Sequence, residues 1–141
     1  MIVMRLLSSL KHDESERGIF HLGRALIKND HTSIIISSAE KDNELVKRLE
    51  REGNLYHQLY MNKKSWAALL QIIPLRHLIE KYNPDVIHVH SRTPAWILHL
   101  ALRRARVKRL PKIVSTMYGF YPINKYSQAL LDVDTIITVS D

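Results

Sequence analysis

Two stretches decide the fold: Asp85-Val86-Ile87-His88-Val89-His90-Ser91-Arg92-Thr93-Pro94-Ala95-Trp96 and Lys112-Ile113-Val114-Ser115-Thr116-Met117-Tyr118-Gly119-Phe120-Tyr121. In each, a short run of β-branched residues changes abruptly to polar, glycine or aromatic residues. Buried parallel strands show this pattern when they carry side chains to a site at their carboxyl ends. The two stretches therefore predict an α/β sheet with a crevice along that edge.

The rest of the chain alternates in the same way. We expect strands over residues 2–8, 32–38, 55–61, 86–90, 113–116 and 135–139, and helices over residues 15–29, 43–52, 65–82, 94–106 and 126–131. Crossovers between parallel strands are right-handed, and a central switch point is usual in such sheets. The predicted fold is therefore a Rossmann-like, doubly wound parallel sheet with the strand order 3-2-1-4-5-6.

Two residues modify the predicted helices. Gly53 should stop the charged helix over residues 43–52, because glycine adopts the backbone conformation that ends helices. Pro74 lies inside the apolar pattern of residues 65–82, where its ring would remove a backbone hydrogen bond and clash with the preceding turn. We expect two helical pieces that meet near Ile73.

Composition limits the class of protein. The chain has 141 residues, of which 45% are hydrophobic, and this suits one domain over residues 1–141. It has no cysteine, so disulfides and thiolate metal sites are excluded and a reducing compartment is allowed. Arg5 interrupts the apolar amino terminus, which predicts a first strand instead of a signal peptide. No uncharged apolar run approaches the ~18 residues that span a bilayer, so we expect a cytoplasmic protein, with a peripheral location at the inner face of the membrane as a variant.

Charge is concentrated in one segment. The formal net charge is +7, and a basic cluster precedes the strand expected at 113–116: Arg103, Arg104, Arg106, Lys108, Arg109 and Lys112. Such a cluster is compatible with a solvated helix end, with an anionic membrane or glycolipid, or with nucleic acid. Nucleic acid is the weakest of the three, because aromatic and basic residues do not alternate here. The cluster should lie at the amino-end edge of the sheet, away from the crevice.

The candidate binding residues all follow strands four, five and six. They are His90, Ser91, Arg92, Tyr118, Gly119, Tyr121, Asn124 and Ser140. Because carboxyl ends of neighbouring parallel strands lie about 4.8 Å apart, we expect these residues to converge. His88 and His90 should share one face of a strand, but no third ligand has a recognisable spacing, so no metal is expected.

Two of these groups suggest a ligand. Ser91 and Arg92 lie where the strand ends and the helix expected from Pro94 begins, and free amide groups with a helix dipole suit an anion there. Arg92 is the best single phosphate or glycan contact, with a surface salt bridge as its alternative. The aromatic segment over residues 116–126 could stack on sugar rings and hydrogen-bond hydroxyls, or it could pack on its own domain.

The turn after the first strand does not suit a nucleotide. A dinucleotide fingerprint would place a glycine-rich turn there, but the sequence has Ser8-Ser9-Leu10-Lys11-His12-Asp13-Glu14. No glycine allows a diphosphate to approach the backbone, and two carboxylates would repel it. The pair Gly18 and Gly23 lies inside a helical pattern and is not a phosphate loop. We therefore expect no bound cofactor.

Segments along nearly the whole chain resemble one family. They are Glu16-Arg17-Gly18 with Gly23-Arg24-Ala25-Leu26, then the buried isoleucine strand over residues 32–38, residues 84–96, the aromatic segment through Tyr126-Ser127, and Ile136-Ile137-Thr138-Val139-Ser140-Asp141. Together they resemble the amino-terminal half of retaining glycosyltransferases of family 4, in the lipopolysaccharide-core branch. Two positions depart from the family pattern: Asp13-Glu14 replaces a glycine pair, and Tyr118 replaces the histidine of a His-Gly pair.

The resemblance implies a GT-B arrangement, in which two Rossmann-like domains transfer a sugar with retention from a nucleotide sugar to an acceptor. It implies that this chain is the acceptor-binding half, inactive alone, with a lipopolysaccharide or other glycan as acceptor. A missing carboxyl-terminal domain, a partner subunit or a homodimer would then complete it, and the catalytic residues are unknown. The alternative is a non-catalytic glycan-binding or glycosyltransferase-docking module of the same fold.

Overall fold

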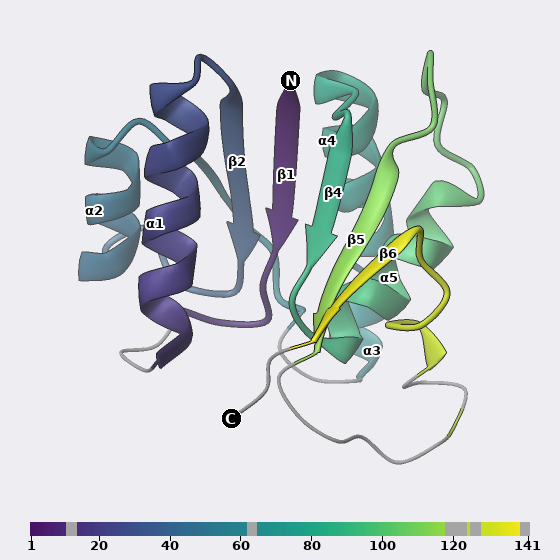
Figure 1. The fold of residues 1–141 in the computed structure, drawn as a ribbon. Coiled ribbons are helices and arrows are strands. Elements are labelled where there is room, and N and C mark those ends of the chain that lie inside the picture. Colours follow the sequence, from purple (N-terminus) through teal and green to yellow (C-terminus); the bar gives the residue numbers. More distant parts are fainter. Residues whose placement is uncertain (11–13, 62–64, 118–123, 125–127, 139–141) are drawn as a thin grey trace.

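The computed structural model describes residues 1–10, 14–61, 65–117, 124 and 128–138. Its strands are β1 (Ile2–Leu6), β2 (Thr32–Ser37), β3 (Leu55–Gln58), β4 (Val86–Val89), β5 (Lys112–Met117) and β6 (Thr135–Thr138); its helices are α1 (Glu14–Lys28), α2 (Glu44–Arg51), α3 (Trp66–Leu69), α4 (Ile72–Tyr82) and α5 (Arg92–Leu102). The strands form one parallel sheet in the order β3-β2-β1-β4-β5-β6, which confirms the predicted fold class and order (Figure 1).

Side chains alternate between the two faces of the sheet and so make two apolar layers. On one face, Met4 and Leu6 of β1 join Ile34 and Ile36 of β2 in a core cluster covered by α3, α4 and α5. On the other face, a smaller cluster joins Ile35 of β2 to residues of α1 and α2. Figure 1 shows α1 and α2 in front of the β1–β2 side of the sheet, and α4 and α5 behind it. The central strands are therefore buried on both faces, as their uninterrupted apolar sequences require.

The strands β5 and β6 form the least covered side of the sheet. Among the described residues, no helix lies in front of them in Figure 1, on the side that α1 and α2 cover elsewhere. All four residues of β6 are exposed, including Ile136 and Ile137 at 42% and 45%. By register, Ile137 pairs with Thr116 of β5, so both side chains lie on the face that α1 and α2 cover elsewhere; Thr116 is buried there and Ile137 is exposed. An exposed apolar surface, which we call the open face of β5 and β6, therefore remains at this edge of the sheet.

The helices follow the predictions with shifted ends. The pattern over residues 65–82 splits as expected into α3 and α4, but the break is at residues 70–71, before Pro74. Pro74 thus lies in the first turn of α4, where its missing N–H group loses no helical bond. Gly53 has a φ of 101° directly after the C-cap Glu52, as predicted. The expectation of a helix to residue 106 was wrong, since α5 ends at Leu102.

Two further expectations concern the carboxyl-terminal part of the chain. The helix predicted over 126–131 includes residues 126 and 127, which lie outside the described residues. The last strand is described through Thr138. Within the described parts of the chain, no helix combines the length and the apolar character that crossing a membrane requires.

Candidate functional site

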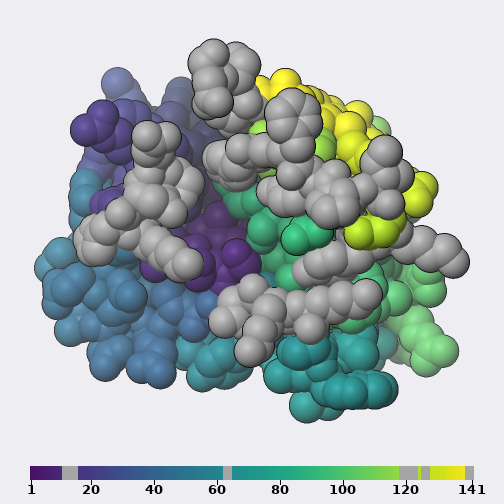
Figure 2. Space-filling view, turned by 90° about the horizontal axis from the view of Figure 1, so that it is seen from below, coloured from purple at the N-terminus to yellow at the C-terminus, as the bar shows by residue number. Residues whose placement is uncertain are grey.

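The crevice lies where β1 and β4 end side by side. The chain leaves β1 toward β2 and β3 on one side and returns through β4 to the other, which is the switch point of a doubly wound sheet. The backbone N–H of His90, just after β4, donates to the carbonyl of Leu6 at 3.1 Å. Figure 2 looks onto these carboxyl ends and shows the purple residues at the end of β1 at the floor of a hollow between the blue and green parts of the molecule.

Two histidines line the β4 side of this crevice. The rings of His88 and His90 lie on the same face of the strand, as predicted, with their centroids 4.1 Å apart. The Nε2 atom of His88 is 2.6 Å from the hydroxyl of Thr116 on β5, and both residues are buried. His90 is partly exposed, although its Nε2 atom is buried. His88 thus lies in the core of the sheet, and His90 lies at the carboxyl edge of the sheet, where it is partly exposed.

The charge of Arg5 acts on these histidines. Arg5 of β1 is completely buried beside His88 in the register of the two strands, and its Nη1 donates to the carbonyl of Ile19 at 2.7 Å. Burial, together with this guanidinium, lowers the pKa of His88 to about 4. Burial, His88 and Arg5 also hold the pKa of His90 well below its usual value. Both rings are therefore neutral near pH 7, and they can offer hydrogen bonds without charge.

The next two residues begin helix α5. Ser91 is its N-cap, with φ −158° and ψ 169°, and its carbonyl accepts from the Ala95 amide at 3.2 Å. The Ser91 hydroxyl is buried and makes no hydrogen bond to any described atom. Arg92 is the first residue of α5 and is partly exposed. His90, Ser91 and Arg92 therefore meet at one helix N-terminus, where the helix dipole favours an anion.

The structure places the remaining predicted residues less completely. Tyr118, Gly119, Tyr121 and Ser140 lie outside the described residues. Asn124 is exposed, and its carbonyl accepts a hydrogen bond from the amide of Gln128 at 3.0 Å. The convergence of all eight residues therefore stays a prediction. In the described part of the chain, no group of three or more His, Asp or Glu residues could hold a metal ion.

The sequence analysis missed the network behind the histidines. The Nη2 atom of Arg5 donates to the hydroxyl of Ser33 at 3.2 Å, and that hydroxyl donates to Oδ1 of Asn54 at 2.6 Å. A Cβ on Gly23 would lie 2.8 Å from the same Oδ1, so only glycine lets α1 pass so closely. The signal in the sequence is Arg5, a single arginine within an otherwise apolar strand.

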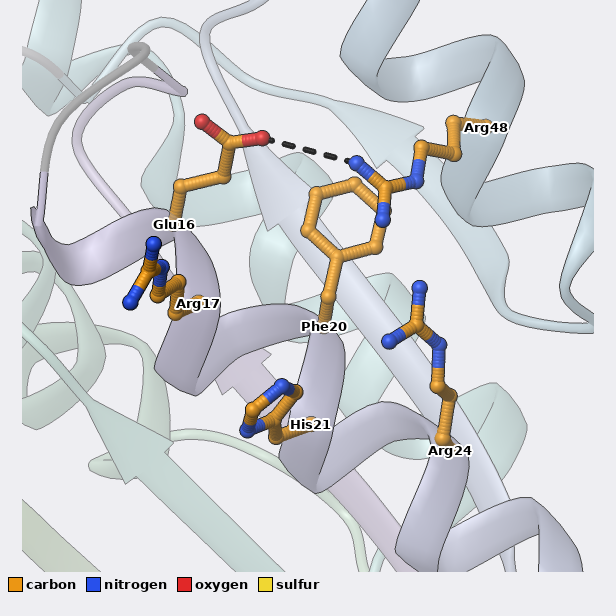
Figure 3. A pocket seen from close by; sticks show the side chains of 6 residues that line it. All are labelled: Glu16, Arg17, Phe20, His21, Arg24 and Arg48. Carbon is orange, nitrogen blue, oxygen red and sulfur yellow. Dashed lines mark ion pairs between the residues drawn. The ribbon is translucent and has the colours of Figure 1, made fainter.

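A separate pocket of about 430 Å³ lies on the outer face of α1 and α2 (Figure 3). Phe20 forms its wall, and the guanidinium of Arg48 lies 4.1 Å from the centre of that ring. Arg48 also pairs with Glu16 at 3.6 Å, while Arg24 pairs with Glu52 at 2.5 Å. These ion pairs neutralise much of the positive charge, so the pocket is best explained as packing between two amphipathic helices.

The basic cluster lies at the opposite edge from the crevice, as predicted. It follows the end of α5 and extends to the first residue of β5, which places it at the amino ends of the strands. There Arg109 pairs with Asp85, and the amide of Ile2 donates to the same carboxylate at 2.7 Å. This amide bond and Arg109 lower the pKa of Asp85.

Comparisons with known proteins give the family. The model of glycosyltransferase family 4 matches residues 15–141, which is most of the chain. The chain belongs to glycosyltransferase family 4. The matched residues include the histidine pair and the N-terminus of α5, whereas β1 with Arg5 precedes them.

Solved structures agree on the fold. A glycosyltransferase from Rickettsia africae ESF-5 is 29% identical, with a TM-score of 0.76 over 99% of this chain and 36% of its own. The apo form of the lipopolysaccharide outer core galactosyltransferase WaaB is 11% identical, with a TM-score of 0.65 over 96% of this chain and 38% of its own. A putative UDP-N-acetylglucosamine 2-epimerase from Listeria monocytogenes is 13% identical, with a TM-score of 0.62 over 98% of this chain and 39% of its own.

The lengths matter for function. This chain spans little more than a third of each of these three structures. No curated protein sequence matches it significantly. The family match and the similarity to solved glycosyltransferase structures support a glycosyl-transfer module of the GT-B, Rossmann-like fold.

Proposed function

We propose that this family 4 domain is the acceptor-binding half of a retaining glycosyltransferase, and that its crevice holds a glycan of the lipopolysaccharide type. The observation that carries the proposal is the neutral His88–His90 pair beside the N-terminus of α5. Sugars present many hydroxyl groups and no charge, so uncharged donors and acceptors bind them without a large desolvation penalty.

The helix N-terminus would recognise a charged substituent. Ser91 and Arg92 combine a hydroxyl, a guanidinium and the positive end of α5 within two consecutive residues. A phosphate on the glycan is the group that such an arrangement binds best, because the guanidinium can donate two parallel hydrogen bonds to it. We therefore propose that Arg92 contacts a phosphorylated acceptor, with Tyr118, Gly119, Tyr121, Asn124 and Ser140 completing the crevice.

The donor would be held by a second domain, in the same polypeptide or in a partner. The sequence between β1 and α1 has no glycine to admit a diphosphate, and it ends in Asp13, directly before Glu14. Transfer from a nucleotide sugar requires groups that stabilise the departing diphosphate, and electrostatic stabilisation of this kind is usually a large part of catalysis. We propose that the 141 residues alone transfer nothing.

Calorimetry tests this division of roles. The 141-residue chain is titrated with phosphorylated and dephosphorylated core oligosaccharides and with a panel of nucleotide sugars. We expect saturable binding of the phosphorylated oligosaccharide, and only weak binding of every nucleotide sugar. Micromolar binding of a nucleotide sugar with turnover by this chain would overturn the proposal.

One observation favours the second candidate, a docking module. The open face of β5 and β6 presents exposed Ile137 next to Thr116, which suits protein contact better than water. A module that docks a partner glycosyltransferase would bury this face and use the crevice only for recognition. Finding that the oligosaccharide binds but that no complementing domain restores transfer would favour this second function.

A further inference from the structure

A second pocket lies at the β3 edge of the sheet. In the strand order, β2 separates β3 from β1, where the crevice begins. Its volume is about 460 Å³, and it is formed by the turn after β2, by β3 and by the first three turns of α4. Leu59, Pro74 and Leu78 give it an apolar wall. His57, His77, Lys41 and Lys81 add four basic side chains around this wall. The pocket therefore combines a hydrophobic surface with the positive charge of two lysines and with two imidazole rings.

The positive charge in this pocket is not neutralised by its lining. No carboxylate is among the described residues that form it. The carboxylate of Glu80, next in sequence to Lys81, is 3.8 Å from Arg76 and does not line the pocket. This differs from the pocket of Figure 3, where Glu16 pairs with Arg48. Like charges in one concave site raise the local potential and attract an anion.

One of the four basic groups is held in place before any ligand binds. The Nε2 atom of His57 is 2.8 Å from the hydroxyl of Tyr82, and the two rings are 5.6 Å apart. Nζ of Lys81 in turn lies 5.2 Å from the centre of the Tyr82 ring. Burial, Lys81 and Lys41 all lower the pKa of His57, so both lysines are close enough to oppose its protonation. A bound anion would relieve this repulsion.

We propose that this pocket binds a phosphate monoester, with the phosphate between Lys41 and Lys81 and the organic part of the ligand on Leu59, Pro74 and Leu78. Two lysines match a dianion, because each ammonium group donates charge-assisted hydrogen bonds from a flexible stem. The apolar wall favours an ester over inorganic phosphate. The ester could be a soluble metabolite or a lipid headgroup, since both present the same group to the lysines. The site is independent of glycosyl transfer and of the crevice.

Histidine ring signals in NMR provide the test. The protein, in a buffer free of phosphate, is titrated with glycerol 3-phosphate, and its binding to vesicles of phosphatidylcholine with and without phosphatidic acid is measured in parallel. We expect saturable shifts of the ring signals of His57 and His77, with those of His21 and His88 unchanged. The pKa of His57 should rise when the ester is bound.

Charge-matched variants decide the location. Lys41→Gln and Lys81→Gln should each weaken binding roughly fivefold, as expected for the loss of one partly exposed ion pair. Lys47→Gln is the control, because it removes the same charge from an exposed position on α2 outside the pocket. Shifts with glycerol 3-phosphate identify a soluble ester, and binding to phosphatidic acid vesicles alone identifies a lipid headgroup. In either case, both lysine variants must reduce the binding. The proposal is wrong if neither probe binds, or if Lys47→Gln weakens binding as much as the pocket variants do.

Discussion

His88 shows how one buried side chain sets both the polarity of the crevice and the stability of the fold. It hydrogen-bonds Thr116 in the interior, and burial and Arg5 lower its pKa to about 4. The unfolded chain binds a proton at His88 below about pH 6.5, and the folded chain does not do so until about pH 4. Stability contributed by the neutral ring is therefore complete above pH 6.5 and decreases as the pH falls toward 4.

We expect the free energy of unfolding to decrease between pH 6.5 and pH 4, with His88 accounting for about 3 kcal/mol of the loss. His90 contributes in the same direction, because its pKa is also lowered. Urea denaturation at a series of pH values measures this change. His88→Gln should reduce the pH dependence, since glutamine does not titrate. A wild-type profile that is flat over this range would contradict the described burial.

Gly23 lets helix α1 approach the strands that hold Arg5. Gly23→Ala would bring a methyl group within 2.8 Å of Asn54 Oδ1 and 2.9 Å of Arg5 Nη2, both in a buried network. We expect a loss of about 1–3 kcal/mol, as for other overpacked interiors. Gly18→Ala on the same helix is the matched control, because nothing lies within 4 Å of its added Cβ. It should stabilise the protein by about 0.5–1 kcal/mol, since alanine favours the helix. Equal thermal denaturation midpoints for the two variants would refute this role.

At the scale of elements, the sequence predicted the strands well because their apolar runs are long relative to the turns between them. Ile34, Ile35 and Ile36 could only be a strand buried on both faces, and they are. Helix ends were less predictable because local contacts set them. For example, α4 ends at Asn83, which has a φ of 43° and accepts a hydrogen bond from the Lys108 amide. That partner is 25 residues away, and no periodicity reveals it.

The candidate site could be predicted only in part. Residues 90–92 could be located because they follow a strand and open a helix within three positions. The contacts between Arg5, Ser33 and Asn54 could not be predicted, because they join β1, β2 and the turn before β3 through side chains. The pocket with Lys41 and Lys81 could not be predicted either, because these residues are distant in sequence and line one pocket only in the folded chain.

The basic segment between α5 and β5 should act as a surface element, separate from the crevice. Arg109→Ala should reduce binding to vesicles of anionic lipid at low salt, and the effect should fade as the salt concentration rises. Asp85 keeps its hydrogen bond from the Ile2 amide in this variant, so the fold should persist. Sedimentation of the protein with vesicles measures the effect. Arg92→Ala, at the opposite edge, is the control and should sediment like the wild type. An equal reduction for both would indicate diffuse electrostatic binding.

At the scale of the whole molecule, the described helices cover both faces of the central strands but leave β6 exposed. The open face of β5 and β6 includes Ile137, exposed at 45%. Surfaces of this kind favour association. We expect light scattering to show self-association that increases with protein concentration, and Ile137→Ser to weaken it. Leu70→Ser is the control, because Leu70 is 73% exposed but lies between α3 and α4. A monomer at every practical concentration would contradict this expectation.

The central claim is that a specific crevice at the carboxyl ends of the strands binds the acceptor. The most direct measurement is NMR titration of the wild type, Arg92→Ala and Arg109→Ala with a phosphorylated core oligosaccharide. We predict that the amide signals of His90, Ser91 and Arg92 shift saturably. Arg92→Ala should weaken the affinity by about 1.5–3 kcal/mol, the range for a charged hydrogen bond, while Arg109→Ala leaves it unchanged. Equal weakening by the two substitutions, or shifts confined to the basic segment, would contradict the claim.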